Sequence, residues 1–233
     1  MGEVPIGVLC LETAFTKIPG HIRNPVTFGF PVIYQVVSGA TPERVVTQGD
    51  PALLEPFTEA ARYLTAQGAA AITTGCGFLV LFQRELAAAV EVPVYTSSLI
   101  QLPMVAAMLR PGQQVGLLVA KKEALTGAHL AAVGAAGLPV KVAGMAGQPE
   151  FREVILEGRR TSLDVARLRG EVLAEAGRLA GPDLGAVVIE CTDLVPFAPD
   201  IQELLQVPVF DIVTLTRMVH ESLTRKAVKT NVC

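Results

Sequence analysis

The sequence has few charged residues and little net charge. Asp, Glu, Lys and Arg make up 18% of its 233 residues, and the formal net charge at pH 7 is -3. With a hydrophobic fraction of 51%, the composition is that of a compact globular protein and excludes a disordered chain. The small negative net charge gives no sign of the basic surface by which proteins bind nucleic acid. The length suits one large domain or two small ones.

Paired cysteines and common catalytic motifs are also missing. No CxxC is present, and no histidine stands at zinc-ligand spacing from a cysteine, so a disulfide framework or structural metal is excluded. We expect free thiols and no metal or cofactor. There is no Walker A motif, GxSxG or HExxH. Gly75-Cys76-Gly77 only begins a dinucleotide fingerprint, because Val80 stands where the third glycine belongs.

Long apolar runs are absent too. The apolar run within residues 1–11 is far shorter than a membrane span, and it has no basic leader or cleavage site. We therefore expect a cytoplasmic protein that binds neither a membrane nor nucleic acid.

What the sequence does contain is an internal duplication. Cys76 follows an apolar, strand-like run, and so does Cys191, which lies 115 residues further on. The Val-Pro-Val that begins at Val92 recurs at Val207, again 115 residues later. The two cysteines therefore occupy equivalent places in two halves of one chain.

Apolar strand-like runs alternate with helical patterns in both halves, which favours parallel sheets covered by helices. We predict an α/β fold of two pseudo-symmetric subdomains, residues 1–112 and 113–233, with the site in the cleft between them and a C-terminal helix that can cross back. Asp50-Pro51 is predicted to start a helix, with the aspartate as N-cap.

A long connection with many prolines and glycines follows the first strand, over residues 13–50. Short strands are expected within it at 32–37 and 44–47, and the connection could act as a lid or binding loop. Its polar residues His21, Arg23 and Asn24 could hold a substrate carboxylate, although the usual exposure of such residues favours a plain surface role.

The pattern of two strand-end cysteines suits proton transfer. Ligands of open α/β sheets bind at the carboxyl edges of strands, and a helix N-terminus there favours a thiolate or an anionic ligand. If Cys76 and Cys191 face each other, one can take a proton from a carbon next to a carboxylate while the other delivers a proton to the opposite face. Donors for the developing charge are expected from Thr74, Ser97, Ser98, Thr192 and the backbone at Gly75 and Gly77.

Structural roles compete with these functional ones. Asp193 is either an orienting acceptor or a helix-start carboxylate, and Asp211 is either a cap or a pocket wall. Single buried cysteines are most often core residues, which is our expectation for Cys10, and Cys233 is expected to be exposed. His129 and His220 fall within helical patterns and are expected on partly exposed faces.

The segments Thr74-Gly75-Cys76-Gly77 and Cys191-Thr192-Asp193 resemble the two catalytic motifs of the cofactor-independent aspartate, glutamate and hydantoin racemase superfamily. The resemblance covers the whole chain and implies a cleft between two α/β subdomains, often in a homodimer. Amino-acid racemases of this kind follow the first cysteine with Asn-Thr, whereas Gly77-Phe78 stands here, and Phe78 is therefore a candidate substrate contact.

Three hypotheses remain open at this point. The first is a racemase or isomerase of a small amino acid or related carboxylate that uses Cys76 and Cys191 as two bases. The second is a cis-trans isomerase of an unsaturated diacid in which one cysteine adds covalently, as in maleate isomerisation. The third is a non-catalytic small-anion binding protein of the same fold.

Overall fold

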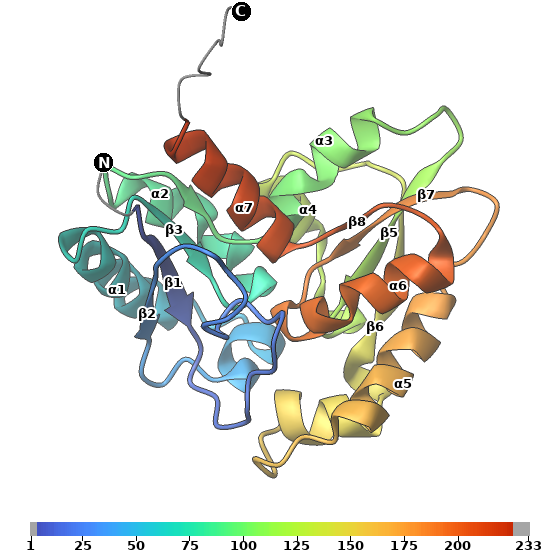
Figure 1. Cartoon of the computed structure of the whole chain (residues 1–233), viewed down its shortest axis with the longest axis horizontal. Coiled ribbons are helices and arrows are strands. Elements are labelled where there is room, and N and C mark those ends of the chain that lie inside the picture. The colour runs from blue at the N-terminus through green and yellow to red at the C-terminus, as the bar shows by residue number, and fades with distance from the viewer. Residues whose placement is uncertain (1–3, 226–233) are drawn as a thin grey trace, which may run out of the picture.

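The computed structural model describes residues 4–225 and consists of two parallel sheets with helices around them (Figure 1). The first sheet has the strand order β2-β1-β3-β4 and the second the order β6-β5-β7-β8, and all neighbouring strands are parallel. The strands of the first sheet are β1 (Ile6–Cys10), β2 (Val32–Val36), β3 (Ala71–Thr74) and β4 (Val94–Tyr95). Those of the second are β5 (Gln114–Val119), β6 (Val140–Gly144), β7 (Leu184–Ile189) and β8 (Val209–Phe210). The predicted α/β fold with parallel sheets is confirmed.

Helices connect the strands and cover the sheets. The α-helices are α1 (Leu54–Ala66), α2 (Gln83–Ala88), α3 (Leu102–Ala107), α4 (Gly127–Ala132), α5 (Val165–Gly177), α6 (Ala198–Leu205) and α7 (Ile212–Leu223). Short 3-10 turns are η2 (Pro51–Leu53), η3 (Gly77–Phe82), η4 (Ser98–Gln101), η5 (Lys122–Ala124), η6 (Met145–Gly147) and η8 (Thr192–Phe197), and two segments, η1 (Glu43–Thr47) and η7 (Phe151–Leu156), are π-helical. None of the helices in residues 4–225 is long and apolar enough to cross a membrane.

Segment 44–47 is a correction to the sequence-based expectation. Its β-branched residues favour a strand, yet the structure places them in the π-helical turn η1. Arg44 fixes this turn, because its guanidinium donates to the carbonyl of Gly39 and to the carboxylate of Asp50. Asp50 is also the predicted N-cap, and its side chain accepts from the N–H of Ala52. The bonds of Arg44 to residues on both sides of the turn therefore override the strand propensity of this segment.

The duplication seen in the sequence is reproduced by the strand registers. Leu9 of β1 pairs with Thr74 of β3, and Leu118 of β5 pairs with Ile189 of β7. In each half the last paired residue of the second strand, Thr74 or Ile189, therefore stands two residues before a cysteine. The chain turns there into a short helix, η3 in the first half and η8 in the second.

The two halves exchange helices. Leu99, Leu102 and Val105, from η4 and α3, pack on Leu117 and Val188 of the second sheet. In return, α7 lies against β3 and η4, as Figure 1 shows at the top of the molecule. The expectation that the C-terminal helix crosses back stays a prediction. The division at residue 112 stays a prediction, because both halves contribute helices to each other.

The crossing helix α7 depends on one buried cap. Asp211 is 3% exposed; its carboxylate accepts from the N–H of Thr214 at 2.8 Å, and the hydroxyl of Thr214 accepts from the N–H of Asp211. The backbone carbonyl of Asp211 also accepts from the side chain of Gln101 at 3.0 Å. Asp211 is thus a cap, and it does not line the cavity described below.

We predict that Asp211→Ala lowers the free energy of unfolding by about 1–2 kcal/mol, because the first turn of α7 loses its side-chain acceptor. Asp211→Asn is the matched control, since its amide oxygen can still accept the same bond. Denaturant unfolding of both variants measures the difference. Equal losses in the two variants would contradict the capping role.

Candidate active site

Cys76 and Cys191 line one cavity between the two halves. Each is the residue before a 3-10 turn, with an extended backbone, and the two are 8% and 6% exposed. The cavity holds about 440 Å³ of space that no protein atom fills, counting the solvent at its mouth. The residues that line it are Leu11, Thr13, Lys17, Arg23, Pro42, Val46, Gly75, Cys76, Ala120, Ile155, Leu156, Glu190, Cys191, Thr192 and Asp193.

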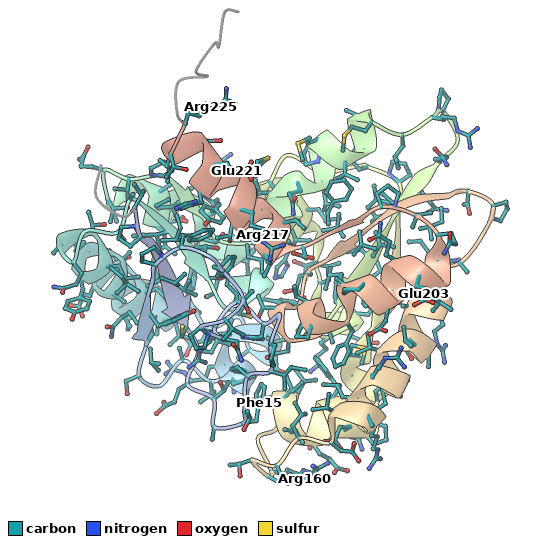
Figure 2. The ribbon with its side chains drawn as sticks, in the orientation of Figure 1. Phe15, Arg160, Glu203, Arg217, Glu221 and Arg225 are labelled. Atoms are coloured by element: carbon teal, nitrogen blue, oxygen red, sulfur yellow. The ribbon has the colours of Figure 1, made fainter. Side chains whose placement is uncertain are left out.

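A wider hollow adjoins this cavity and shares Thr13, Pro42, Ile155 and Leu156 with it. The hollow lies between the connection that follows β1 and the segment around η7. Figure 2 shows Phe15 on the first of these and Arg160 just beyond the second, and both residues line the hollow. The two π-helical segments, one from each half, therefore flank the approach to the cysteines. Such segments are frequent at functional sites.

The connection after β1 supplies the positive charge of the site. Lys17 Nζ lies 3.0 Å from Asp193 Oδ1 and 3.1 Å from the centre of the Phe15 ring. Arg23 donates from Nη1 to the carbonyl of Leu11 at 2.9 Å and to the hydroxyl of Thr13 at 3.0 Å. The segment predicted to be a lid or binding loop thus forms one wall of the cavity.

Asp193 is held as a carboxylate by its neighbours. Burial alone would raise its pKa, but Lys17 and His21 outweigh burial and hold the pKa well below its usual range. His21 Nδ1 accepts from the N–H of Arg23 at 2.9 Å, so its proton lies on Nε2, which is 3.0 Å from Asp193 Oδ1. Burial lowers the pKa of His21 despite this carboxylate, and the ring is neutral near pH 7.

Both thiols are protonated near neutral pH. Burial raises the pKa of Cys76 far above its usual value, and the charge of Glu190 raises it further. The pKa of Cys191 is also raised well above the ordinary value, first by burial and then by the charges of Asp193 and Glu190. A thiolate therefore forms only when a ligand or a proton acceptor changes these surroundings.

Glu190 stands next to Cys191 and reaches into the other half. A Cβ atom on Gly77 would lie 2.4 Å from Glu190 Oε1 and 2.6 Å from the backbone oxygen of Glu190. A glycine is therefore required beside Cys76 because the strand end of the second half occupies the space of a side chain. The hydroxyl of Thr192 makes a second link at this place, donating to the carbonyl of Gly75 at 2.7 Å.

The other residues predicted to contact substrate support the site from outside. Thr74 Oγ1 lies 2.8 Å from the carbonyl oxygen of Cys76 and 2.6 Å from that of Thr96, and its hydroxyl proton is shared between these acceptors. These bonds fix the turn. Ser97 caps η4, and Ser98 Oγ donates to the carbonyl of Ile189 at 2.7 Å. Neither these three residues nor Gly77 belongs to the cavity lining, whereas Gly75, Thr192 and Asp193 do.

Phe78 and Asn24 also lie away from the cavity lining. Phe78 packs edge-on against the His129 ring, with 5.0 Å between the ring centres. His129 is 4% exposed and completes the cap of α4, which corrects the expectation of a partly exposed face. Asn24 donates to the carbonyl of Lys17 and accepts from the N–H of Val26, so its amide shapes the loop.

The sequence-based reasoning missed Lys17, Thr13 and Glu190. Lys17 and Thr13 lie in the connection that follows β1, whose carboxyl end shares a sheet edge with that of β3. Glu190 carried a signal of its own, because an acidic residue directly follows the buried run Ala186 to Ile189. Cys10 is fully buried as expected, and Cys10, Cys76 and Cys191 are free thiols. Cys233 lies outside the described residues.

Gly77→Ala is expected to lower the free energy of unfolding by about 1–3 kcal/mol, because its new Cβ overpacks against the backbone of Glu190. Gly75→Ala is the control, since a Cβ there meets its nearest atom at 3.6 Å. Thermal or denaturant unfolding tests this, and an equal effect of the two substitutions would contradict the close packing of the halves.

Asp193→Asn is expected to lower stability at pH 7 by about 1.5–3 kcal/mol, because Lys17 loses its charged partner in a buried place. The folded pKa of Asp193 lies below the unfolded value, so its contribution is present above about pH 4 and is lost as pH falls through the folded pKa. The gap between the two proteins in unfolding free energy should therefore close in acid. A gap that stays constant down to pH 2 would contradict this assignment.

The sequence is similar to that of known proteins. A family model described as Asp/Glu/Hydantoin racemase matches residues 98–217. Dimethylsulfoniopropionate lyase 7 of Emiliania huxleyi is 30% identical over 221 residues, which cover 90% of this chain and 64% of that protein. The chain thus spans less than two thirds of the length of this relative.

Two solved structures share the fold. Arylmalonate decarboxylase superposes with a TM-score of 0.60 at 18% identity, covering 94% of this chain and 92% of that one. Glutamate racemase from Aquifex pyrophilus gives a TM-score of 0.59 at 14% identity, with 95% and 84% covered. Among residues 4–225, no group of three or more His, Cys, Asp or Glu side chains is arranged to hold a metal ion. With its family model covering more than half of its length, the chain belongs to the Asp/Glu/hydantoin racemase family.

Proposed function

We propose that this chain is an enzyme that removes the proton next to the carboxylate of a small organic acid, with Cys76 and Cys191 as its acid-base pair. The observation that carries this proposal is that the two cysteines, from equivalent strand ends of opposite halves, line one cavity. A proton donor and acceptor on two sides of one small ligand is what such chemistry needs. No other cysteine in the described part of the chain lines this cavity.

Arg23 is the group we assign to the substrate carboxylate. Its Nη1 is fixed by the carbonyl of Leu11 and the hydroxyl of Thr13, while within residues 4–225 its Nη2 and Nε donate no hydrogen bond. A guanidinium with free donors on the cavity wall suits a planar carboxylate. Lys17 is already paired with Asp193, so Arg23 carries the uncompensated positive charge.

Removal of this proton leaves negative charge on the carbon next to the carboxylate. The next step that we favour is elimination of a leaving group from the neighbouring carbon. The support is the 30% identity to a dimethylsulfoniopropionate lyase and the character of the cavity wall. Asp193 is engaged by Lys17 and His21, which leaves it poorly placed to accept from a substrate ammonium. A sulfonium group carries positive charge without an N–H donor, and it fits beside apolar side chains such as Val46 and Ile155.

The elimination balances without a cofactor. One cysteine thiolate takes the α proton, and the electron pair of that C–H bond forms the new carbon-carbon double bond. The bond between the β carbon and sulfur breaks, and its electron pair leaves with the sulfur as neutral dimethyl sulfide. The products are acrylate, dimethyl sulfide and one proton, which the cysteine later releases to solvent.

Racemisation is the second candidate, and the paired placement of the cysteines favours it. After one cysteine has taken the α proton, the other delivers a proton to the opposite face and inverts the carbon. The isomerase predicted from the sequence, acting on a small amino acid or related carboxylate, would work in this way. A homodimer also stays a prediction.

One experiment separates these functions. The protein is incubated in heavy water with dimethylsulfoniopropionate, and separately with a panel of amino acids and hydantoins. Dimethyl sulfide and acrylate are followed by gas chromatography and NMR, and α-deuterium by mass spectrometry. We expect dimethyl sulfide release, with a loss of at least about 100-fold in kcat/KM for Cys76→Ser and for Cys191→Ser, since a hydroxyl is a poor acid-base group here.

Deuterium incorporation with inversion of an amino acid, and no dimethyl sulfide, would instead establish the racemase. Cys10→Ser is the control, because Cys10 is fully buried and does not line the cavity. Full activity in either cavity variant, or no turnover and no exchange with any compound, would overturn the proposal.

A further inference from the structure

Glu190 breaks the symmetry of the duplicated site. The 115-residue offset that relates Cys76 to Cys191 also relates Gly75 to Glu190, so a position without a side chain in one half carries a carboxyl in the other. This carboxyl lies against Gly77 of the opposite half, in the space that a side chain there would fill. It is the one acidic group of the cavity lining besides Asp193.

The bonding of Glu190 is incomplete. The residue is 1% exposed, and Oε2 accepts from the N–H of Ala120 at 3.2 Å. Oε1 is buried and has no hydrogen-bond partner among the described residues. The N–H groups of Gly77 and Phe78 lie near enough to lower the pKa of the carboxyl, but neither makes a hydrogen bond to Oε1.

No cation compensates Glu190. Asp193, three residues further on, is paired with Lys17 and with His21, whereas no basic group of residues 4–225 lies within salt-bridge distance of Glu190. Burying a charge without a partner is costly, and burial accordingly raises the pKa of Glu190 to about 8. The carboxyl therefore gains or loses its proton near neutral pH.

The groups that face Glu190 come from each element packed around it. The turn after β3 brings Cys76, and the turn after β7 brings Cys191 and Asp193. The connection after β1 brings Lys17 and His21, which are committed to Asp193, and Arg23. After β5, the N–H of Ala120 donates to Glu190 Oε2, and the ammonium of Lys121 donates to the hydroxyl of Thr47.

We propose that Glu190 is a positioning residue that shares a single negative charge with the cysteine pair. While Glu190 is ionised both thiols stay neutral, and when a thiol gives up its proton Glu190 holds one. The unpartnered Oε1 is the atom that holds it, since it is the buried oxygen with free lone pairs next to the turn of Cys76. No cation of residues 4–225 lies within salt-bridge distance of Glu190 to offset a second negative charge. Glu190 and a cysteine are therefore not ionised together at neutral pH.

This inference rests on the proposed function, because it describes how the same cysteine pair becomes a base. While both thiols are neutral, the cysteine pair is unreactive toward stray electrophiles. A substrate that carries a positive charge, or that binds Arg23, changes the relative pKa values of Glu190 and the cysteines. The negative charge can then move from Glu190 to a cysteine. Proton removal from the substrate is thereby confined to the occupied site.

The test is the titration of the thiols without substrate. Wild type, Glu190→Gln and Glu190→Asp are compared by the pH dependence of thiolate ultraviolet absorbance and of iodoacetamide alkylation, with Cys76 and Cys191 resolved by peptide mass spectrometry. In Glu190→Gln we expect thiolate to form about 1 pH unit lower than in wild type, because a neutral amide no longer repels it. Glu190→Asp retains the charge and should stay close to wild type.

Glu43→Gln is the matched control, since Glu43 is an exposed carboxyl that lines the adjoining hollow. It should leave the thiol titration unchanged. Thermal unfolding verifies that each variant is folded. Identical thiol titrations in wild type and Glu190→Gln, or equal shifts in the Gln and Asp variants, would overturn the inference.

A second measurement follows the titration of the Glu190 carboxyl itself in the wild-type protein. Carbon-13 NMR of the glutamate side-chain carboxyls in wild-type protein should show one group that titrates near pH 8, and its signal is assigned by its absence from Glu190→Gln. A midpoint near the usual glutamate value would overturn the inference. Because neither readout uses turnover, a failed activity assay would count against the proposed function and leave this test intact.

Discussion

The cavity depends on the contact between two strand ends that belong to opposite halves of the chain. The hydroxyl of Thr192 donates to the carbonyl of Gly75, and Glu190 fills the space beside Gly77. These contacts bring the turns that carry Cys76 and Cys191 to one cavity. The exchange of helices holds this geometry, because Ser98 of the first half donates to the carbonyl of Ile189 at the end of β7. Neither half would place a cysteine there alone.

The electrostatics of the site follow from how each buried charge is partnered. Asp193 has Lys17 and His21 beside it and remains a carboxylate, whereas Glu190 has no cation and its pKa is raised. Two acidic groups three residues apart thus differ in charge near neutral pH because of their neighbours alone. The buried thiols are protonated near neutral pH, so a base for proton transfer has to be created when a ligand binds.

The evidence for the family is separate from the evidence for the function. The family is shown by the match over residues 98–217, and the likeness to arylmalonate decarboxylase and glutamate racemase extends the fold to the whole chain. A shared fold does not fix the reaction. Glutamate and arylmalonate, which the names of these two structures give as substrates, are small carboxylates, and our proposal also takes a small carboxylate as the substrate.

The sequence predicts the two sheets of parallel strands, the equivalence of Cys76 and Cys191 and the helix start at Asp50-Pro51, because periodicity, repeat offset and capping residues are local signals. It failed at 44–47, where bonds from Arg44 turn a β-branched run into a helical turn. It also left open whether Ser98 and Thr74 would face the ligand, and the structure uses both hydroxyls for backbone carbonyls.

The folded chain was needed to show that Lys17 and Arg23 form a wall of the cavity and that Glu190 Oε1 is buried between the halves with no hydrogen-bond partner among the described residues. Such roles depend on contacts between residues more than 100 positions apart, and burial and charge pairing arise only when those residues meet in space.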